Sequence, residues 1–354
     1  MVQKKRSLKD KSEKELSEIK DKDVKAEAVK LATAALKKKY GKAAIIYMKD
    51  FSKRSMDLIP TGSVGLDFAI GLPGIPRGKM VEVIGEEASG KTTLAISIIA
   101  QALSKFPEDV LFIDAEKSLD PELMVEMGVD ISRVVMVDMD TAEENLTATE
   151  TLVKTGAFSA VIVDSVAALV PTAEFDGDMD DQFMGLHARL MGKMCRSLKP
   201  ACSKTNTLLL LINQVRHKIG AYGNPDTTPG GKAIPFFSDL RIKVSGGATK
   251  KQRILGTSGE AIGHVNKFVV IKNKLKRPWR EAEVDLLYGS GYDVVGELLS
   301  LGIATGLVSK EGSWFSYEGI KAQGIERFKL ALSADKGIEA SLKKDVSSVL
   351  WQTK

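Results

Sequence analysis

The sequence predicts an α/β protein built around a mostly parallel sheet, and three observations lead to this prediction. Between about residues 58 and 290, short runs of β-branched and aliphatic residues alternate with segments of helical texture. Each run is apolar almost throughout, which is typical of strands buried on both faces of a sheet. A length of 354 residues exceeds what one hydrophobic core usually serves, so two or three domains are expected. The runs are Val81–Ile84, Val110–Ile113, Val134–Val137, Ala160–Val163 and Leu208–Ile212.

The later runs are spaced differently. Leu240–Val244, Phe268–Ile271 and Val284–Tyr288 have little helix between them, so we expect the far edge of the sheet to be antiparallel. After Gly296 helical texture dominates, with an aromatic patch at Trp314–Tyr317 in a predicted hairpin. We therefore predict a basic arm with a docking helix at residues 1–53, a main domain at residues 54–293 and a small α+β domain at residues 294–354.

The N-terminal segment carries the basic charge of the chain. Residues 1–53 hold 16 Lys and Arg against 8 Asp and Glu, a net +8, so the other 301 residues carry −3 of the total of +5. Such an arm can bind nucleic acid or an acidic neighbour, although a charged tail also simply keeps a chain in solution. Residues 1–23 read as disordered or as a frayed helix.

A helix is predicted next, because apolar residues recur every three or four positions from Val24 to Leu36 and Gly41 follows. An isolated helix with so small an apolar stripe cannot fold alone. It must therefore dock, either on its own core or on a neighbouring subunit.

Composition excludes three classes of protein. The longest apolar stretches run to about five residues, far below the roughly 20 that span a bilayer, and no apolar stretch follows the basic N-terminus as in a secretory signal. Cys195 and Cys202 cannot form a disulfide framework, which favours reduced thiols in a cytoplasm. With three histidines and two cysteines, a structural zinc site is not expected.

A phosphate-binding loop is the strongest local signal. A strand precedes it and a helical run beginning at Thr93 follows it, which is the context that such a loop requires. Its glycines let backbone N–H groups surround phosphate oxygens, and the helix N-terminus adds positive potential. Lys91 is expected at the β- and γ-phosphates and the Thr92 hydroxyl on Mg²⁺. The motif is Gly85-Glu86-Glu87-Ala88-Ser89-Gly90-Lys91-Thr92.

Two carboxylates follow core strands. Asp164 ends the run Ala160–Val163, where a carboxylate holds Mg²⁺ directly or through water in nucleotide hydrolases, although Asp at this place could equally cap the next helix. Glu116 follows the run that ends at Ile113, where it can orient or deprotonate an attacking water. For Glu116 the alternative is a carboxylate at the rim of the site.

Two loops are candidates for binding a second ligand. Residues 215–232 form a long Gly/Pro/Thr-rich loop with Arg216, Lys218 and Lys232 at its ends, which suits a flexible grip on a phosphate backbone. The segment at 175–182 is acidic, and composition alone would not assign it to DNA.

Taken together, the motifs resemble those of RecA-type recombination ATPases of bacteria and bacteriophages, over roughly residues 26–345. The fold that this implies is a RecA-like ATPase core. Besides the phosphate loop, the segments that carry the resemblance are Ser55-Met56-Asp57 with Thr61-Gly62-Ser63, Phe112 to Glu116 with Leu119-Asp120-Pro121, Val163 to Leu169, Met184-Gly185-Leu186, Ile212 to Arg216, Gly223-Asn224-Pro225, Lys272-Asn273-Lys274 and Tyr288-Gly289.

The resemblance implies roles for matching residues. Glu116 would act on water, Gln214 would join the γ-phosphate to the basic loop, and Lys272 and Lys274 would reach the ATP of a neighbouring subunit. The nucleotide would contact residues 85–93, Asp120 and Asp164, with Mg²⁺ on Thr92 and Asp164. The DNA-binding loops would be residues 175–184 and 215–232, with Met184, Arg189, Arg196, Arg216, Lys218, Ile219, Gly230, Gly231 and Lys232 near the strand.

The sequence departs from the family pattern at several positions. Lys117 stands where His usually follows the catalytic Glu, and Leu123 replaces an aromatic that stacks on adenine. Recognition of the base is therefore expected to be looser or supplied by other residues. The second DNA loop is one residue shorter, and the chain ends at Lys354 without an acidic tail.

The implied activity is ATP-dependent recombination: helical filaments of the protein on single-stranded DNA, pairing with double-stranded DNA, and DNA-stimulated ATP hydrolysis with Mg²⁺. A cytoplasmic location and no membrane partner are expected. Three alternatives are a ring-forming RecA-fold motor, a metabolite kinase with the same loop, and a mediator that binds ATP without turnover. The Lys272-Asn273-Lys274 motif, the absence of an arginine-bearing lid and the intact Glu116 argue against these in turn.

Overall fold

The computed structural model describes residues 23–41, 45, 47–48, 56–178, 185–217, 226–247, 252–256 and 258–352. The chain divides into two units, Met1–Met56 and Asp57–Lys354. In the first unit residues 23–40 are helical, and Gly41 follows with φ +95°, as the apolar stripe predicts. The expectation of a disordered or frayed segment before this helix falls almost entirely outside the described residues.

The second unit contains the sheet and the helices that cover it. Its strands are β1 (Leu58–Ile59), β2 (Ile75–Pro76), β3 (Met80–Gly85), β4 (Asp109–Asp114), β5 (Val134–Val137), β6 (Phe158–Asp164), β7 (Leu208–Gln214), β8 (Arg216–His217), β9 (Asp226–Thr227), β10 (Leu240–Gly246), β11 (Arg253–Leu255), β12 (Ala261–Asn273), β13 (Glu281–Leu287), β14 (Gly291–Tyr292), β15 (Ser309–Glu311), β16 (Trp314–Tyr317) and β17 (Ile320–Gln323). Its α-helices are α3 (Val64–Ile70), α4 (Lys91–Lys105), α5 (Pro121–Glu126), α6 (Ala142–Val153), α7 (Thr172–Phe175), α8 (Leu186–Thr205), α9 (Ala233–Phe237), α10 (Val294–Ala304), α11 (Ile325–Ala334) and α12 (Lys336–Gln352).

The main sheet is parallel at its centre and antiparallel at one edge, as predicted. Its strand order is β14-β13-β12-β10-β3-β7-β6-β4-β5, and β11 pairs with β12. All pairs from β10 to β5 are parallel. The direction changes between β10 and β12, so the run at Leu240–Val244 belongs to the parallel part.

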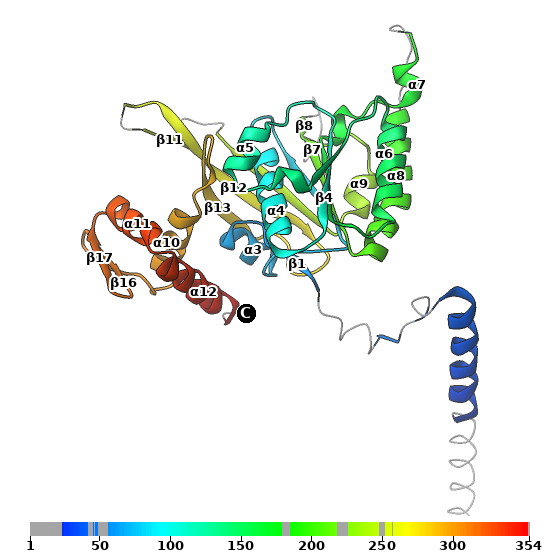
Figure 1. Ribbon diagram of the computed structural model, residues 1–354, viewed down its shortest axis with the longest axis horizontal. Helices are drawn as coiled ribbons and strands as arrows, with labels where there is room; N and C mark the ends of the chain where they lie inside the picture. The colour runs from blue at the N-terminus through cyan, green and yellow to red at the C-terminus, as the bar shows by residue number, and fades with distance from the viewer. Residues whose placement is uncertain are drawn as a thin grey trace, which may run out of the picture. The chain divides into compact units, whose positions relative to one another are not determined.

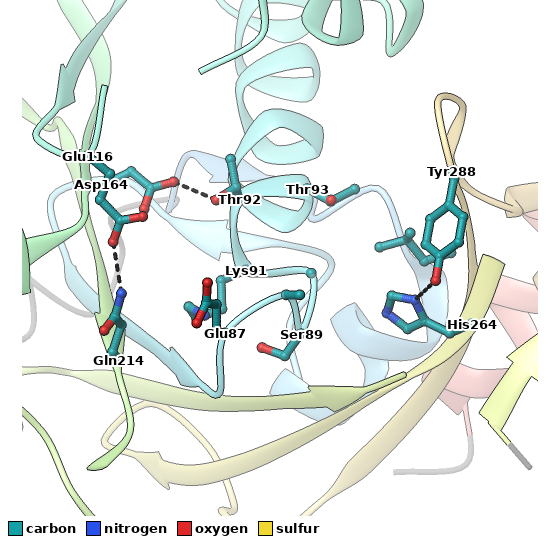
Figure 2. A pocket seen from close by; sticks show the side chains of 13 residues that line it. Glu87, Ser89, Lys91, Thr92, Thr93, Glu116, Asp164, Gln214, His264 and Tyr288 are labelled. Atoms are coloured by element: carbon teal, nitrogen blue, oxygen red, sulfur yellow. Dashed lines mark hydrogen bonds between the residues drawn. The ribbon is translucent and has the colours of Figure 1, made fainter. Parts of the chain in front are cut away.

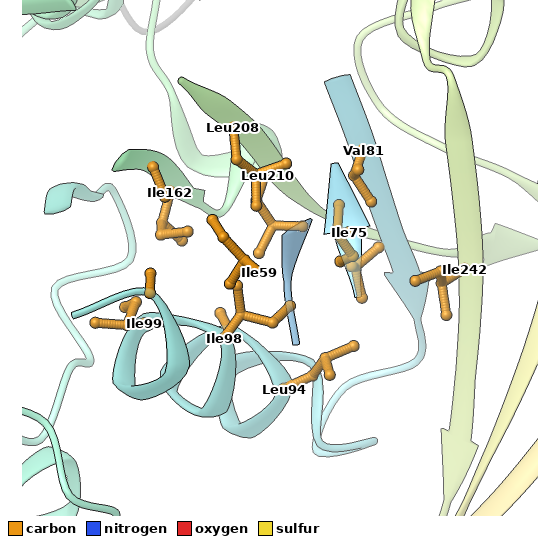
Figure 3. Close-up of a cluster of buried hydrophobic side chains, with 14 of the residues drawn as sticks. Ile59, Ile75, Val81, Leu94, Ile98, Ile99, Ile162, Leu208, Leu210 and Ile242 are labelled. Atoms are coloured by element: carbon orange, nitrogen blue, oxygen red, sulfur yellow. The ribbon is translucent and has the colours of Figure 1, made fainter. Parts of the chain in front are cut away.

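The central strands are apolar throughout because both faces of the sheet are buried. Alternate residues of β7, Leu208, Leu210 and Ile212, belong to one core, while Leu209 and Leu211 belong to another. Helix α4 packs on the first face (Figures 1 and 3) and α6 with α8 on the second (Figure 1). Each strand must therefore be apolar at every position rather than at alternate ones.

Residues after Gly291 build a third core. Leu298 of α10, Phe328 of α11 and Val346 of α12 are fully buried together with residues of β16, whose strand pairs with β15 and β17. The predicted aromatic hairpin at Trp314–Tyr317 is thus the middle of a three-stranded sheet.

Helix α3 joins this third core to the main sheet. The Glu297 carboxylate accepts hydrogen bonds from the Ser63 hydroxyl and from the Val64 and Gly65 N–H groups at the start of α3. At the far end, the Trp351 ring packs edge-on against Phe68. Polar and aromatic contacts therefore tie the C-terminal helices to the core.

Among the described ranges, no helix is long and apolar enough to cross a membrane. Cys195 and Cys202 lie buried on α8 as free thiols, and burial raises the pKa of each to about 12.

Candidate active site

The phosphate loop leaves β3 at Gly85 and enters α4 at Lys91. Gly90 has φ +88°, and a Cβ there would stand 2.3 Å from Nδ2 of Asn266. A Cβ at Gly85 would stand 2.5 Å from the Val244 carbonyl. Both glycines are therefore required by the close passage of the loop over β10 and β12.

A pocket of about 250 Å³ opens over this loop (Figure 2). It brings together the loop, the two predicted carboxylates and Gln214, which come from the ends of β4, β6 and β7. The carboxyl ends of parallel strands meet at one edge of the sheet, which is where ligands bind in open α/β folds. Its lining residues are Glu87, Ala88, Ser89, Gly90, Lys91, Thr92, Thr93, Glu116, Asp164, Gln214, His264, Leu286 and Tyr288.

Lys91 lies at the middle of the pocket with its ammonium Nζ 2.5 Å from the Glu86 carbonyl. Burial lowers its pKa, and the negative charges of Asp164 and Glu116 oppose that effect. The side chain is 9% exposed, so an incoming phosphate would meet a cation that has already lost most of its water.

Thr92 and Asp164 form a pair of oxygen donors. The Thr92 hydroxyl donates to the Asp164 carboxylate at 2.7 Å. Burial raises the pKa of Asp164 to about 6, and the charge of Glu116 adds to this, while the Thr92 hydrogen bond works the other way. A hydroxyl beside a carboxylate is a donor set that suits Mg²⁺, because hard cations prefer oxygen.

Glu116 is held from two sides. Its Oε1 accepts hydrogen bonds from the Ser165 hydroxyl at 2.5 Å and from the Gln214 amide Nε2 at 3.0 Å. Since Gln214 ends β7 and Arg216 begins β8, this contact joins the carboxylate to the start of the basic loop.

The other residues predicted near the nucleotide lie outside the lining. Gly85 and Glu86 lead into the loop. Asp120 caps α5, accepting from the Glu122 and Leu123 N–H groups. Lys272 donates to the Pro235 and Phe236 carbonyls and Lys274 to that of Phe236, so both bond α9 rather than this pocket.

The described part of the second predicted DNA loop lies beside α7, the helix that leads into the first one. A cavity of about 340 Å³ is lined by Glu174 of α7 from one side and by Arg216 and residues 227–229 from the other. The cations predicted at DNA, Arg189, Arg196, Arg216 and Lys232, are all exposed.

The two predicted glycines allow the end of the second loop to pass close to α8. Gly230 and Gly231 have φ +85° and +71°, and a Cβ at either would stand about 3.0 Å from α8 side chains, those of Met191 and Ala188. Predictions for Met184, Lys218 and Ile219 concern positions outside the described residues.

Four site residues were given no role from the sequence, although Ser165 and Tyr288 stand in segments that carry the resemblance. Ser165 contacts Glu116, and the Tyr288 ring and His264 close the end of the pocket away from Glu116 (Figure 2). Leu286 also lines the pocket. The last three lie at the antiparallel edge, and pairing of β12 with β13 sets His264 opposite Leu286. Only strand register brings them to a loop that lies far earlier in the chain.

Comparison with known proteins gives the same picture over most of the chain. A family model described as RecA N-terminal domain matches residues 27–293, and one described as RecA C-terminal domain matches residues 296–350. The chain is similar to Protein RecA of Thermus aquaticus, with 45% identity over 86% of this chain and 88% of that one. Protein RecA of Caldanaerobacter subterraneus subsp. tengcongensis is 41% identical (91% and 93% covered), and that of Chloroherpeton thalassium 42% (93% and 91%).

Proposed function

The chain belongs to the RecA family of DNA-dependent ATPases that act in homologous recombination and repair, and we propose how its own residues carry out that activity. ATP binds in the pocket over the phosphate loop with Mg²⁺, and the protein assembles as helical filaments on single-stranded DNA and pairs it with double-stranded DNA. The observation that carries the proposal is the single pocket that holds Lys91, Thr92, Asp164, Glu116 and Gln214.

Nucleotide binding rests on the loop and on Lys91. The helix α4 N-terminus and the N–H groups of residues 87–92 face the phosphates, and Lys91 exchanges the Glu86 carbonyl for a β- or γ-phosphate oxygen. Thr92 and Asp164 would hold Mg²⁺, which neutralises charge on the phosphates. Deprotonated Asp164 serves this role best, and its hydrogen bond from Thr92 favours that form.

Hydrolysis rests on Glu116. Its carboxylate lies in the same pocket as the loop, where it can orient a water toward the γ-phosphate and take its proton. Ser165 and Gln214 both bond Oε1, which fixes the carboxylate and leaves Oε2 for water.

Coupling to DNA rests on Gln214. Its side chain contacts Glu116 and its main chain continues into Arg216 of β8, so a change at the γ-phosphate is two residues from a cation of the loop. Arg189, Arg196 and Lys232 are exposed and suit a DNA backbone.

Assembly is proposed to depend on two lysines and one helix that contact a neighbouring subunit. Lys272 and Lys274 are proposed to reach a neighbour's nucleotide. The helix at residues 23–40 is proposed to dock on a neighbour, because an isolated helix with so small an apolar stripe cannot fold alone. We place the protein in the cytoplasm, because its DNA substrate is found there and because that compartment keeps thiols such as its two free cysteines reduced.

The deciding experiment is ATP turnover with and without single-stranded DNA over a range of salt. A recombinase should be stimulated by DNA, and the stimulation should fall as salt displaces phosphate contacts. Turnover indifferent to DNA would favour a metabolite kinase and contradict the proposal. Electron microscopy with a slowly hydrolysed ATP analogue distinguishes a recombinase from a ring-forming motor. Filaments are expected, and closed rings would indicate the ring motor.

A further inference from the structure

A buried carboxylate interrupts the apolar strand β3. Glu82 is 0% exposed, and its neighbours Val81 and Val83 pack in the core that α4 covers. Burying a carboxylate between two strands costs free energy that an apolar side chain at the same position would not cost. Stability alone therefore does not account for this residue, and its hydrogen-bond partners point to another role.

Each oxygen of the Glu82 carboxylate accepts a hydrogen bond. Oε2 accepts one from Nε of Arg241 at 2.6 Å, and Oε1 accepts one from the Asn213 amide Nδ2 at 3.1 Å. Strand register explains both contacts, because Arg241 of β10 stands opposite Glu82, while Asn213 lies on β7, which pairs with β3 on the other side. The Arg241 side chain also lines a cavity of about 740 Å³ together with Thr227 and Lys232 of the second loop. The carboxylate thus joins three neighbouring strands below that loop.

The Asn213 amide extends this contact to two parts of the proposed machinery. Its Nδ2 also donates to the Pro229 carbonyl at 3.0 Å, where the second loop returns toward α9. Its Oδ1 accepts a hydrogen bond from the Gln214 N–H at 3.0 Å, and the Gln214 side chain contacts Glu116 (Figure 2). The end of the loop and the residue beside Glu116 therefore bond the same amide group.

The Asn213 amide satisfies all of these contacts in one orientation. Turned over, it would place its NH₂ group against the Gln214 N–H and its oxygen against the Pro229 carbonyl, so donors would face donors and acceptors would face acceptors. Glu82 selects the observed orientation, because a carboxylate accepts hydrogen bonds and cannot donate one. Arg241 holds the carboxylate from the other side.

We propose that Glu82 is a positioning residue that couples DNA at the second loop to hydrolysis at Glu116 by fixing the orientation of the Asn213 amide. The proposal rests on the proposed function, because it takes ATP to bind over the phosphate loop and DNA to bind residues 215–232. A displacement of the loop reaches Gln214 through this amide as well as through the main chain. Coupling between two binding sites is reciprocal, so the effect of the nucleotide on DNA affinity measures it directly.

The test measures how a slowly hydrolysed ATP analogue changes the affinity for single-stranded DNA. In Glu82→Gln the side chain keeps its size and its oxygen can still accept from Arg241, but its NH₂ group then faces Asn213 and favours the turned-over amide. The factor by which the analogue changes DNA affinity should therefore fall roughly tenfold toward one, a size typical of coupling between sites. The DNA-stimulated kcat should fall with it, while KM for ATP stays near the parental value.

Glu297→Gln is the matched control, because it makes the same change at a buried carboxylate that bonds the start of α3. It should keep the parental coupling even where urea titration shows both variants to be less stable than the parent. Glu82→Asp keeps the negative charge for the long Arg241 side chain but draws the carboxylate back from Asn213. It should lose coupling as Glu82→Gln does, and it decides the question if Glu82→Gln fails to fold.

Parental coupling in either folded variant at Glu82 would overturn the inference and leave the proposed function intact. An equal loss of coupling in Glu297→Gln would also overturn it, because the loss would then follow from lowered stability at any buried carboxylate. If the analogue leaves DNA affinity unchanged in the parent, the coupling described under the proposed function is itself wrong, and both proposals fall.

Discussion

At the scale of single residues, the phosphate loop is organised around a buried cation. Lys91 is nine-tenths buried and bonded to the Glu86 carbonyl. Burial lowers the pKa of Lys91, and the negative charges of nearby carboxylates such as Asp164 and Glu116 act in the opposite direction by favouring the charged ammonium. A phosphate group would therefore replace a weak partner with a strong one.

Lys91→Ala should abolish tight nucleotide binding, because the point charge at the β- and γ-phosphates is lost and no other pocket cation replaces it among the described lining residues. Equilibrium binding of a fluorescent ATP analogue measures this. Lys105→Ala, at the exposed end of the same helix, is the control and should bind normally. Turnover at a near-parental rate in Lys91→Ala would show the loop assignment to be wrong.

Glu116→Gln should have a different effect. The amide keeps an acceptor for the Ser165 and Gln214 hydrogen bonds but cannot take a proton. ATP and DNA should still bind while hydrolysis falls roughly 10²–10⁴-fold. Single-turnover hydrolysis measures the loss of turnover, and filament lifetime measures whether ATP and DNA stay bound. Glu122→Gln, at an exposed position, is the control. Filaments that disassemble at the parental rate would contradict the role.

At the scale of elements, the sequence predicted the strands well, but it did not predict that β12 and β13 contribute to the wall of the pocket. Strands β3, β4, β6 and β7 are apolar at every position because both their faces are buried, and that pattern is visible in the sequence. The phosphate loop and the strand-end carboxylates follow from local order along the chain. His264 could not be found this way, because its place depends on the register between β12 and its neighbours.

The junction at α3 is a second element that the sequence did not reveal. Asp67 accepts hydrogen bonds from the Thr61 N–H and hydroxyl, and Glu297 bonds the start of the same helix. Burial raises the pKa of Asp67 from 3.8 to about 7, helped by Glu297 and opposed by the Thr61 bonds and Lys343. Burial likewise raises the pKa of Glu297.

These shifts predict that the protein becomes less stable as pH rises from about 4 to 7. In that window the unfolded chain releases the Asp67 proton while the folded chain retains it. For a pKa shift from 3.8 to about 7, this lowers the free energy of unfolding by on the order of 4 kcal/mol. Below pH 4 Asp67 is protonated in both the folded and the unfolded state, and its contribution to stability is fully present. Asp67→Asn should therefore flatten the dependence of unfolding free energy on pH, as measured by urea titration at pH 5, 6, 7 and 8. Parallel curves for variant and parent would refute it.

At the scale of the whole molecule, the pocket of one subunit is proposed to bind the nucleotide and to position water, but its described lining offers Lys91 as its one cation. Negative charge accumulates on the phosphates in the transition state, and a second cation would stabilise it. Lys272 and Lys274 are the groups that the resemblance assigns to a neighbour's nucleotide. In the single chain they bond carbonyls at the end of α9, where cations also stabilise a helix.

The two roles predict different behaviour for the double variant Lys272→Ala with Lys274→Ala. If the lysines act across an interface, nucleotide binding by the monomer should persist while DNA-stimulated turnover is lost. Arginine fingers contribute about 10³–10⁵-fold in other nucleotide hydrolases, and lysines are expected to give less. If they only stabilise α9, the variant should turn over ATP with DNA much as the parent does.

A mixing experiment separates action across the interface from local damage. Protomers with Glu116→Gln and both lysines are combined with protomers that keep Glu116 but carry the two lysine-to-alanine changes. Each kind is inactive alone, yet a mixed interface can pair an intact Glu116 with the lysines of its neighbour. Recovery of DNA-dependent hydrolysis would place the lysines at the neighbour's phosphates, because damage within one subunit cannot be repaired by another. No recovery, in filaments shown to contain both protomers, would rule out that role and leave the lysines as partners of α9.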